Sequence, residues 1–209
     1  MFKYTKEESN SRVLEAIEAL KSGRGVLVFD GESRENEVDL IFPAKTISNE
    51  QMAQLIHYGS GIVCLCLPES KCNEIGLKLM VSEEDNQSIN KTAYTITIEA
   101  AEGVTTGVSA KDRVTTIKAA ISDNFTRGDI HFPGHVFPLK AKENGVLERQ
   151  GHTEASVDLS FLAGFGKAGV IAELTNPDGT MTTVDEALEF SNKFNYPLIT
   201  ISDLVSFLE

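Results

Sequence analysis

The sequence predicts an α+β fold, in which a mixed β-sheet forms the core of a single domain and helices flank it in layers. Segments with the spacing of amphipathic helices recur between short apolar runs that are typical of strands. No internal repeat, low-complexity segment or linker divides the 209 residues, a length that suits one domain. The domain is therefore expected to span residues 1–209.

The first third of the chain is expected to form a helix, two strands and a second helix. Apolar residues recur at helical spacing as far as Gly23, which would end the first helix. Residues 25–29 and 40–42 are apolar runs typical of buried strands. Ser48 begins a capping-box pattern, so a second helix should start there.

The middle of the chain is expected to alternate between strands and loops. Residues 62–67 form a continuous apolar run, which predicts a buried strand. Residues 83–90 are polar and are expected to form a mobile loop. Apolar and polar residues alternate over 94–99, which predicts a half-buried strand. Ser109 should cap a helix, and residues 124–134 should form a loop.

The last third of the chain is expected to contribute three more strands to the sheet. Residues 136–139 and 170–174 have the apolar character of strands, and a helix is expected over 154–163 between them. Thr183 should cap a further helix. Residues 197–201 should form the last strand, followed by a short closing helix.

The overall charge bears on the class of partner. The chain has a net charge of −12, which argues against nucleic acid or an anionic membrane as a partner. Neither a signal peptide nor a membrane-length apolar run is evident. The three cysteines, Cys64, Cys66 and Cys72, are an odd number and predict reduced thiols and a cytoplasmic protein.

The most unusual segment is the acidic stretch at residues 30–40, which reads D-G-E-S-R-E-N-E-V-D-L. Carboxylates this close repel one another, and burying them is costly unless a cation offsets their charge. Mg²⁺ and Mn²⁺ are hard cations that take oxygen ligands, so a site for either is expected here. A solvated acidic hairpin loop is the alternative interpretation.

Two turns could hold a phosphate group. Residues 103–107 read G-V-T-T-G before a predicted helix start, where backbone N–H groups and threonine hydroxyls can face an anion. An ordinary strand-to-helix turn would look the same. Arg149 stands just before another helix start and offers a fork of donors. His152, in the same segment, is either a ligand or a polar loop residue.

Two other residues could transfer protons. His135 follows Pro133 and Gly134 before a predicted strand, where it could be a general acid or base or a solvent-facing turn residue. Glu173 is the charged residue of an apolar strand. Such a carboxylate either faces water or belongs to a site that raises its pKa.

Five blocks of the sequence resemble the 3,4-dihydroxy-2-butanone-4-phosphate synthase family. They occur in the family's order and cover nearly the whole chain. The blocks are 34–37 with Asp39, 59–64, 95–109 with Asp112 and Arg113, 133–138, and 151–155 with 173–176 and 178–181.

The resemblance implies an enzyme of riboflavin biosynthesis, a Mg²⁺-dependent carbon–carbon lyase. Its substrate would be D-ribulose 5-phosphate, and its products 3,4-dihydroxy-2-butanone 4-phosphate and formate. The reaction would proceed through enediolate formation, dehydration, a skeletal rearrangement and loss of C4. The resemblance also implies one or two Mg²⁺ or Mn²⁺ ions per subunit and a homodimer with its sites near the interface. The family is often fused to a GTP cyclohydrolase II domain, and no such domain is expected within these 209 residues.

The resemblance also implies roles for individual residues. Glu35 and His152 would ligate the metal, with Glu37 nearby as a ligand or a water-mediated contact. His135 and Glu173 would transfer protons, with Asp39 as a further candidate. The substrate contacts that it implies lie at Arg34 and Asp39 for the hydroxyls, at Arg149, Thr153 and Thr106 for the phosphate, and at Glu35, Gln150, Gly151, His152, Glu173 and Cys64.

Three positions depart from the family's usual pattern: Gly31, Val38 and Phe132 stand where Asp, Gly and Arg are common. Val38 puts the shape of the acidic turn in question, because glycine reaches backbone angles that valine does not. Two other functions fit the same residues. A metal-dependent sugar-phosphate isomerase or aldolase would release no formate, and a disabled site would leave only a binding module for metal or sugar phosphate.

Overall fold

The structure, a computed structural model, describes residues 4–209. The elements of this part of the chain are α1 (Lys6–Lys21), β1 (Val26–Phe29), β2 (Val38–Pro43), α2 (Asn49–Tyr58), β3 (Cys64–Pro68), α3 (Glu69–Ile75), β4 (Ile98–Ala100), α4 (Ala110–Ala120), β5 (Ile130–Ala141), η1 (Gly145–Leu147), α5 (His152–Leu162), β6 (Gly169–Glu173), α6 (Val184–Phe194), β7 (Leu198–Thr200) and α7 (Ile201–Leu208). No helix in residues 4–209 has the length and apolarity needed to cross a membrane.

The strands form one mixed sheet, which confirms the predicted α+β class. Their order across the sheet is β4-β5-β3-β6-β2-β1-β7. β1 runs parallel to β7 and β3 parallel to β5, whereas the remaining neighbours are antiparallel. β6 lies at the centre, so its residues are covered on both faces and flanked by β3 and β2.

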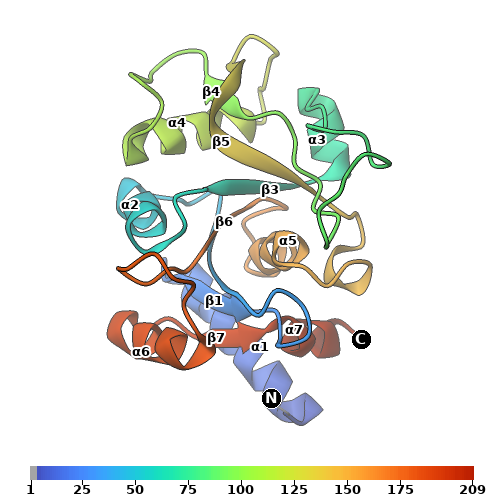
Figure 1. The fold of residues 1–209 in the computed structure, drawn as a ribbon, viewed down its shortest axis with the longest axis vertical. Coiled ribbons are helices and arrows are strands. Elements are labelled where there is room, and N and C mark those ends of the chain that lie inside the picture. Colours follow the sequence, from blue (N-terminus) through green and yellow to red (C-terminus); the bar gives the residue numbers. More distant parts are fainter. Residues whose placement is uncertain (1–3) are drawn as a thin grey trace.

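Helices cover both faces of the sheet, as Figure 1 shows. On one face, α2, α4 and α6 pack with Leu40, Leu65 and Val170 in one apolar cluster. On the other, α1, α5 and α7 pack with Ile41 and Ile171 in a second. Because side chains alternate between the faces of a strand, each central strand contributes to both clusters. The result is a sheet between two layers of helices, in agreement with the expected mixed sheet flanked by helices in layers.

The helix starts agree well with the sequence. The side chains of Ser48, Ser109 and Thr183 each accept a hydrogen bond from the backbone N–H three residues on. The first helix ends at Lys21, just before Gly23, whose φ of 78° suits glycine. Local capping chemistry was therefore sufficient to place these helix starts.

The predicted loop over 124–134 is wrong in its second half, because β5 already begins at Ile130. The register explains this: Val136 pairs with Ile98 and His131 with Glu99, so residues 132–135 have no partner on β4. They form a β-bulge, and a bulge tolerates the proline that would disrupt regular pairing. His135 therefore lies within a strand, at a bulge, and not at a strand entrance.

The predicted strand over 94–99 is also mostly wrong. β4 covers only Ile98–Ala100, and Tyr94 and Thr95 make isolated bridges to Leu139 and Leu79. Thr95 is buried although it is polar, because its hydroxyl donates to the carbonyl of Pro138 at 3.0 Å. A satisfied hydroxyl can occupy the core, so the apolar–polar alternation was misleading here.

Candidate active site

An acidic pocket lies where the ends of β2 and β6 meet. Asp39 is directly opposite Glu173 in the antiparallel register of these strands. Ile41 and Ile171, two residues further along each strand, belong to the apolar cluster beneath α5. Strand alternation therefore places both carboxylates on the α5 side of the sheet.

Asp30 shapes the turn between β1 and β2. Its carboxylate accepts hydrogen bonds from the backbone N–H groups of Glu35 and Glu37 at 3.0 and 3.1 Å. It also accepts one from the Arg34 guanidinium at 2.7 Å. The fixed turn holds the Glu35 and Glu37 backbone beside the end of β2.

Val38 does not disturb this turn. The left-handed backbone positions are Gly31, with φ of 103°, and Asn36, with φ of 59°. Val38 is the first residue of β2, pairs with Phe29 and is buried in the core. Ordinary strand angles suffice there, so the departure from glycine is accommodated.

His152 stands at the first position of α5 and is 5% exposed. Its Nε2 lies 3.0 Å from the carbonyl oxygen of Val28, to which it must donate a proton. In the neutral ring, Nδ1 then carries the lone pair, and it lies 3.4 Å from Asp39 Oδ1 and 3.9 Å from Glu35 Oε2. Burial lowers the pKa of His152, which favours this neutral form.

The carboxylates of the pocket are costly to ionise. Burial raises the pKa of Asp39 well above its usual range, and the charges of Glu173 and Glu37 raise it further. Asp39 Oδ1 is buried, and no hydrogen bond from the described residues reaches it. Burial and the charges of Glu173 and Glu35 raise the pKa of Glu37 to about 7. A cation would relieve all of these costs.

The residues present fit a divalent metal. Potential ligand atoms of Asp30, Glu35 and His152 all lie within 4.8 Å of one another. Two of these residues are predicted ligands. Asp30 was not predicted, and Glu37 is outside this group of three. Carboxylate oxygens with one imidazole nitrogen, whose other nitrogen donates to a backbone carbonyl, form a donor set typical of metal sites.

Arg149 is held beside the same pocket. Its Nη1 donates to the buried carboxylate of Glu154 at 2.6 Å. Its Nη2 donates to the Asn90 carbonyl and to the Thr92 hydroxyl at 3.1 and 3.0 Å. A Cβ on Gly151 would lie 2.3 Å from the Arg149 guanidinium, so glycine is needed for this arrangement.

Two neighbouring hollows with shared lining residues give the site its volume. A pocket of about 50 Å³ is lined by the predicted residues Arg34, Glu35, Glu37, Asp39, Arg149, His152, Thr153 and Glu173, together with Thr92, Tyr94, Leu139 and Ile171. A cavity of about 600 Å³ shares Thr92, Tyr94 and Arg149 with it. A space large enough for a sugar phosphate therefore adjoins the acidic pocket.

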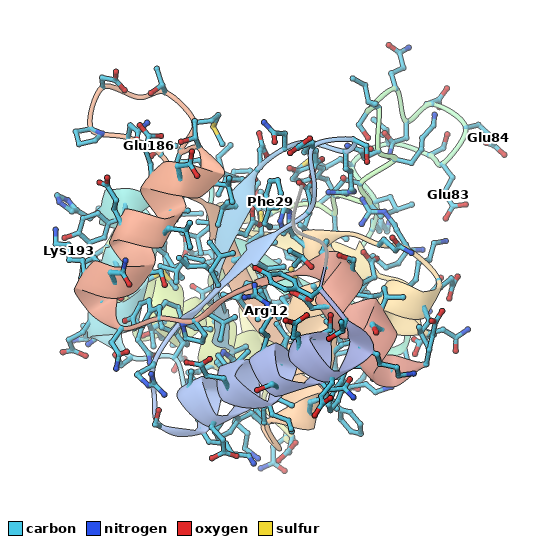
Figure 2. The ribbon with its side chains drawn as sticks, turned by 90° about the horizontal axis from the view of Figure 1, so that it is seen from below. Arg12, Phe29, Glu83, Glu84, Glu186 and Lys193 are labelled. Atoms are coloured by element: carbon cyan, nitrogen blue, oxygen red, sulfur yellow. The ribbon has the colours of Figure 1, made fainter. Side chains whose placement is uncertain are left out.

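The loop over 83–90 borders the larger cavity. It has no regular structure, and Ile89 is 97% exposed. Glu83 and Glu84 project outward from the edge of the molecule (Figure 2). Asn90 is different, because its side-chain amide donates to Glu35 at 2.8 Å. One end of the loop therefore contacts the acidic pocket.

Glu173 lines the pocket and does not simply face solvent. It is half-buried, and the hydroxyl of Ser60 donates to its Oε2 at 2.5 Å. The interpretation of Glu173 as an outward-facing strand residue, left open by the sequence, does not fit this position.

Five predicted site residues do not line this pocket: Cys64, Thr106, His135, Gln150 and Gly151, the last of which is the N-cap residue of α5. Cys64 is buried in the sheet, and Gln150 is exposed. Thr106 lies on the turn after β4, where Asp112 already accepts from the N–H of the adjacent Gly107 at 3.1 Å. His135 is on β5, separated from β6 by β3, and its Nδ1 lies 2.6 Å from Glu99. Their assigned roles remain predictions.

Three polar residues that hold predicted site residues in place were not identified from the sequence. Asp30 belongs to the acidic stretch, but its hydrogen bonds to the backbone of the turn are evident only in the folded structure. Glu154 lies in the first turn of α5, five residues after Arg149, a spacing that could have suggested the pair. Glu99 was interpreted as the polar position of an alternating strand, and only the bulge brings it to His135.

Comparison with known proteins identifies the family of this chain. A family model described as 3,4-dihydroxy-2-butanone 4-phosphate synthase matches residues 14–207. A protein of that name from Haemophilus influenzae (strain 86-028NP) is 62% identical over 199 residues, which cover 95% of this chain and 92% of the relative.

Similar solved structures belong to the same family. The crystal structure of the synthase from Candida albicans has a TM-score of 0.85 and 43% identity, covering 94% of this chain and 97% of that one. Another synthase, solved in complex with two magnesium ions, has a TM-score of 0.89 and 34% identity, covering 94% of this chain and 96% of that one.

Proposed function

This chain belongs to the 3,4-dihydroxy-2-butanone 4-phosphate synthase family, and we propose that its acidic pocket carries out the family's reaction with the residues assigned below. The enzyme converts ribulose 5-phosphate into 3,4-dihydroxy-2-butanone 4-phosphate and formate in riboflavin biosynthesis. One observation carries the assignment of the site: the lone-pair nitrogen of His152 faces the Asp39 and Glu35 carboxylates at 3.4 and 3.9 Å. A cation bound between these groups would offset the cost of burying their charges together.

The proposed metal ligands are Glu35 and His152, with Glu37 close by and Asp30 supporting the turn. A related synthase was solved with two magnesium ions, which supports Mg²⁺ as the cofactor here, with Mn²⁺ as a substitute. When bound, the ion supplies Lewis-acid polarisation of the substrate's oxygen atoms.

Substrate binding is proposed to divide between two groups of residues. Arg149 and Thr153 bind the phosphate, because a guanidinium fork and the N-terminus of α5 both favour an anion. Thr106, Gln150 and Gly151 add contacts to the substrate. Arg34 and Asp39 hold the sugar hydroxyls, and their charges fix the orientation of the carbon chain in the pocket.

Proton transfer is proposed for Glu173, Asp39 and His135. Removal of the C3 proton begins the reaction, and further proton transfers accompany loss of the C1 hydroxyl as water and release of C4 as formate. Glu173 is placed at the pocket wall by β6 and held by Ser60. Each such transfer is worth about 10²–10⁴-fold in rate.

A homodimer is part of the proposal. His135 does not line the pocket of its own chain, and its side chain is 48% exposed. A site close to a subunit interface could receive His135 from a second copy. The three cysteines are buried and free, which supports the expected cytoplasmic location.

The deciding experiment follows carbon by NMR. Ribulose 5-phosphate labelled with ¹³C at C4 should yield labelled formate in the presence of Mg²⁺ or Mn²⁺, and none with EDTA. An isomerase or aldolase would consume substrate without formate, and a binding module would leave it unchanged. Full formate release by metal-free protein would remove the metal from the mechanism.

A further inference from the structure

The geometry points to Glu99 as a positioning residue for His135: its carboxylate holds the imidazole as the Nδ1–H tautomer and leaves Nε2 free to exchange a proton with the substrate. This inference rests on the proposed role of His135 in proton transfer. Glu99 itself touches no part of the acidic pocket, so it would act through the histidine.

The first step is the contact between the two side chains. His135 Nδ1 lies 2.6 Å from Glu99 Oε2. An ionised carboxylate only accepts hydrogen bonds, so the proton of this bond belongs to Nδ1. In the neutral ring the lone pair is then on Nε2. A carboxylate that selects a histidine tautomer in this way is a common feature of proton-transfer sites.

The second step is the anchoring of Glu99. The hydroxyl of Thr116, on α4, donates to Glu99 Oε1 at 2.9 Å and is fully buried. The same hydroxyl accepts from the backbone N–H of Ala100 at 3.0 Å. Both oxygens of the carboxylate are therefore engaged, one by the helix and one by the histidine. Glu99 cannot turn away from His135 without losing the Thr116 hydrogen bond.

The third step is the bulge that delivers the histidine. Residues 132–135 are unpaired on β4, so the bulge decides where the His135 ring points. The bulge passes tightly against β4: the Gly134 N–H donates to Thr97 Oγ1 at 3.0 Å, and a Cβ at Gly134 would lie 2.0 Å from the Ile98 carbonyl oxygen. Without the bulge, regular pairing of β5 with β4 would place His135 beside a residue other than Glu99.

The last step is the turn at Gly107, which covers one side of the Glu99–His135 hydrogen bond. A Cβ on Gly107 would lie 1.8 Å from Glu99 Oε2 and 2.6 Å from His135 Nδ1, so the turn after β4 covers the hydrogen bond itself. The ring as a whole is nevertheless half exposed. Access is therefore left to the Nε2 side, which is the side a substrate must reach.

The tautomer can be measured directly in the substrate-free protein. The chain has four histidines, so ¹⁵N-histidine labelling and long-range ¹H–¹⁵N correlation resolve each ring, and a His135→Gln spectrum assigns one of them. In the wild-type protein the neutral His135 ring should carry its proton on Nδ1. In Glu99→Gln, an amide oxygen that keeps the Thr116 hydrogen bond turns its NH₂ toward Nδ1, so the proton should move to Nε2. A wild-type ring protonated on Nε2, or an unchanged tautomer in Glu99→Gln, would overturn the inference.

Steady-state kinetics distinguish a role of Glu99 in positioning His135 from a role in stabilising the fold. Loss of a group that orients a reacting histidine should lower kcat about 10–100-fold, as for other outer partners of functional histidines, and leave KM unchanged. Glu99→Asp keeps the charge, so it should retain more activity than Glu99→Gln, and it remains testable if the glutamine variant does not fold. Glu189→Gln, an exposed carboxylate on α6, is the matched control and should be fully active.

A double-mutant cycle completes the test. In the His135→Gln background, Glu99→Gln should cause no further loss of kcat, because the two residues act as one unit. Additive losses would show that Glu99 acts elsewhere and would overturn the inference. A fully active His135→Gln enzyme would refute the proposed role of His135 instead, and the tautomer measurement would still decide whether Glu99 sets the state of the ring.

Discussion

Asp39 and Glu173 face each other across β2 and β6, in direct register, with the lone-pair nitrogen of His152 3.4 Å from Asp39. Burial is the main reason that the pKa of Asp39 is raised, and the charge of Glu173 is the next. The metal-free fold therefore contains a built-in electrostatic cost at the place where the chemistry is proposed. This relationship gives the first of four predictions.

Asp39→Asn should stabilise the metal-free protein while abolishing its activity. A carboxyl whose pKa is higher in the folded state than in the unfolded state binds protons more tightly when folded. Its contribution to stability is fully present below the unfolded pKa and is lost as pH rises through the folded pKa. The variant's gain in Tm should thus appear at pH 8 in EDTA and disappear near pH 4. Each 1 kcal/mol gained corresponds to about 2–4 °C for a chain of this size.

Asp123→Asn, an exposed carboxyl in the loop after α4, is the control and should not change Tm. A lower Tm for metal-free Asp39→Asn at pH 8 would contradict the electrostatic cost assigned to the pocket.

Glu173→Gln should fold and bind ribulose 5-phosphate but lose on the order of 10²-fold or more in kcat. The substitution keeps the shape of the side chain and its reach to Ser60, and removes only the ability to take up a proton. Steady-state kinetics with formate detection measures the loss, and substrate titration checks binding. Near-wild-type turnover would leave His135 and Asp39 as the candidates for proton transfer.

Arg149→Lys should raise KM for ribulose 5-phosphate more than it lowers kcat. Lysine keeps the charge but loses the planar fork, and with it the simultaneous bonds to Glu154, Asn90 and Thr92. Loss of one charge-assisted hydrogen bond corresponds to about 10-fold or more in affinity. Arg127→Lys, in a different cavity, is the matched control. An unchanged KM would argue against a phosphate contact at Arg149.

Residues 83–89 should exchange their amide hydrogens quickly in the free enzyme and more slowly once Mg²⁺ and substrate are bound. The loop is exposed except at the partly buried Asn86, and it is joined to the pocket through Asn90, which contacts both Glu35 and Arg149. Ligands at these two residues should therefore order it as a lid. Hydrogen-exchange mass spectrometry measures this, with the exposed turn at 176–179 as an unaffected reference. Equal exchange with and without ligand would show that the loop is not a lid.

Sequence reasoning succeeded where the deciding interactions are local. Capping residues such as Ser48 and Thr183 accept from N–H groups three residues away, so their helices could be placed from the sequence. The acidic stretch indicated a metal site because so many charges cannot be buried without compensation. Glu35, Glu37 and Asp39 are in fact gathered at one pocket.

Sequence reasoning failed where the deciding interactions are distant along the chain. Thr95 is buried because the Pro138 carbonyl accepts from it, and Glu99 meets His135 because a bulge shifts the register of β5. Neither partner can be found by periodicity. The helix α3, Glu69–Ile75, was not predicted, because no capping side chain marks its start in the sequence.

The pairing of β2 with β6 also has a consequence for the order of events during synthesis. Asp39 is made early and Glu173 late, and β6 cannot join the sheet until both have left the ribosome. Until then the carboxylates of the acidic turn remain hydrated and no pocket exists to concentrate them. Because a long-range pairing is the slow step in assembling such a sheet, the nascent chain should have little affinity for divalent ions, and metal capture should mark the completion of folding.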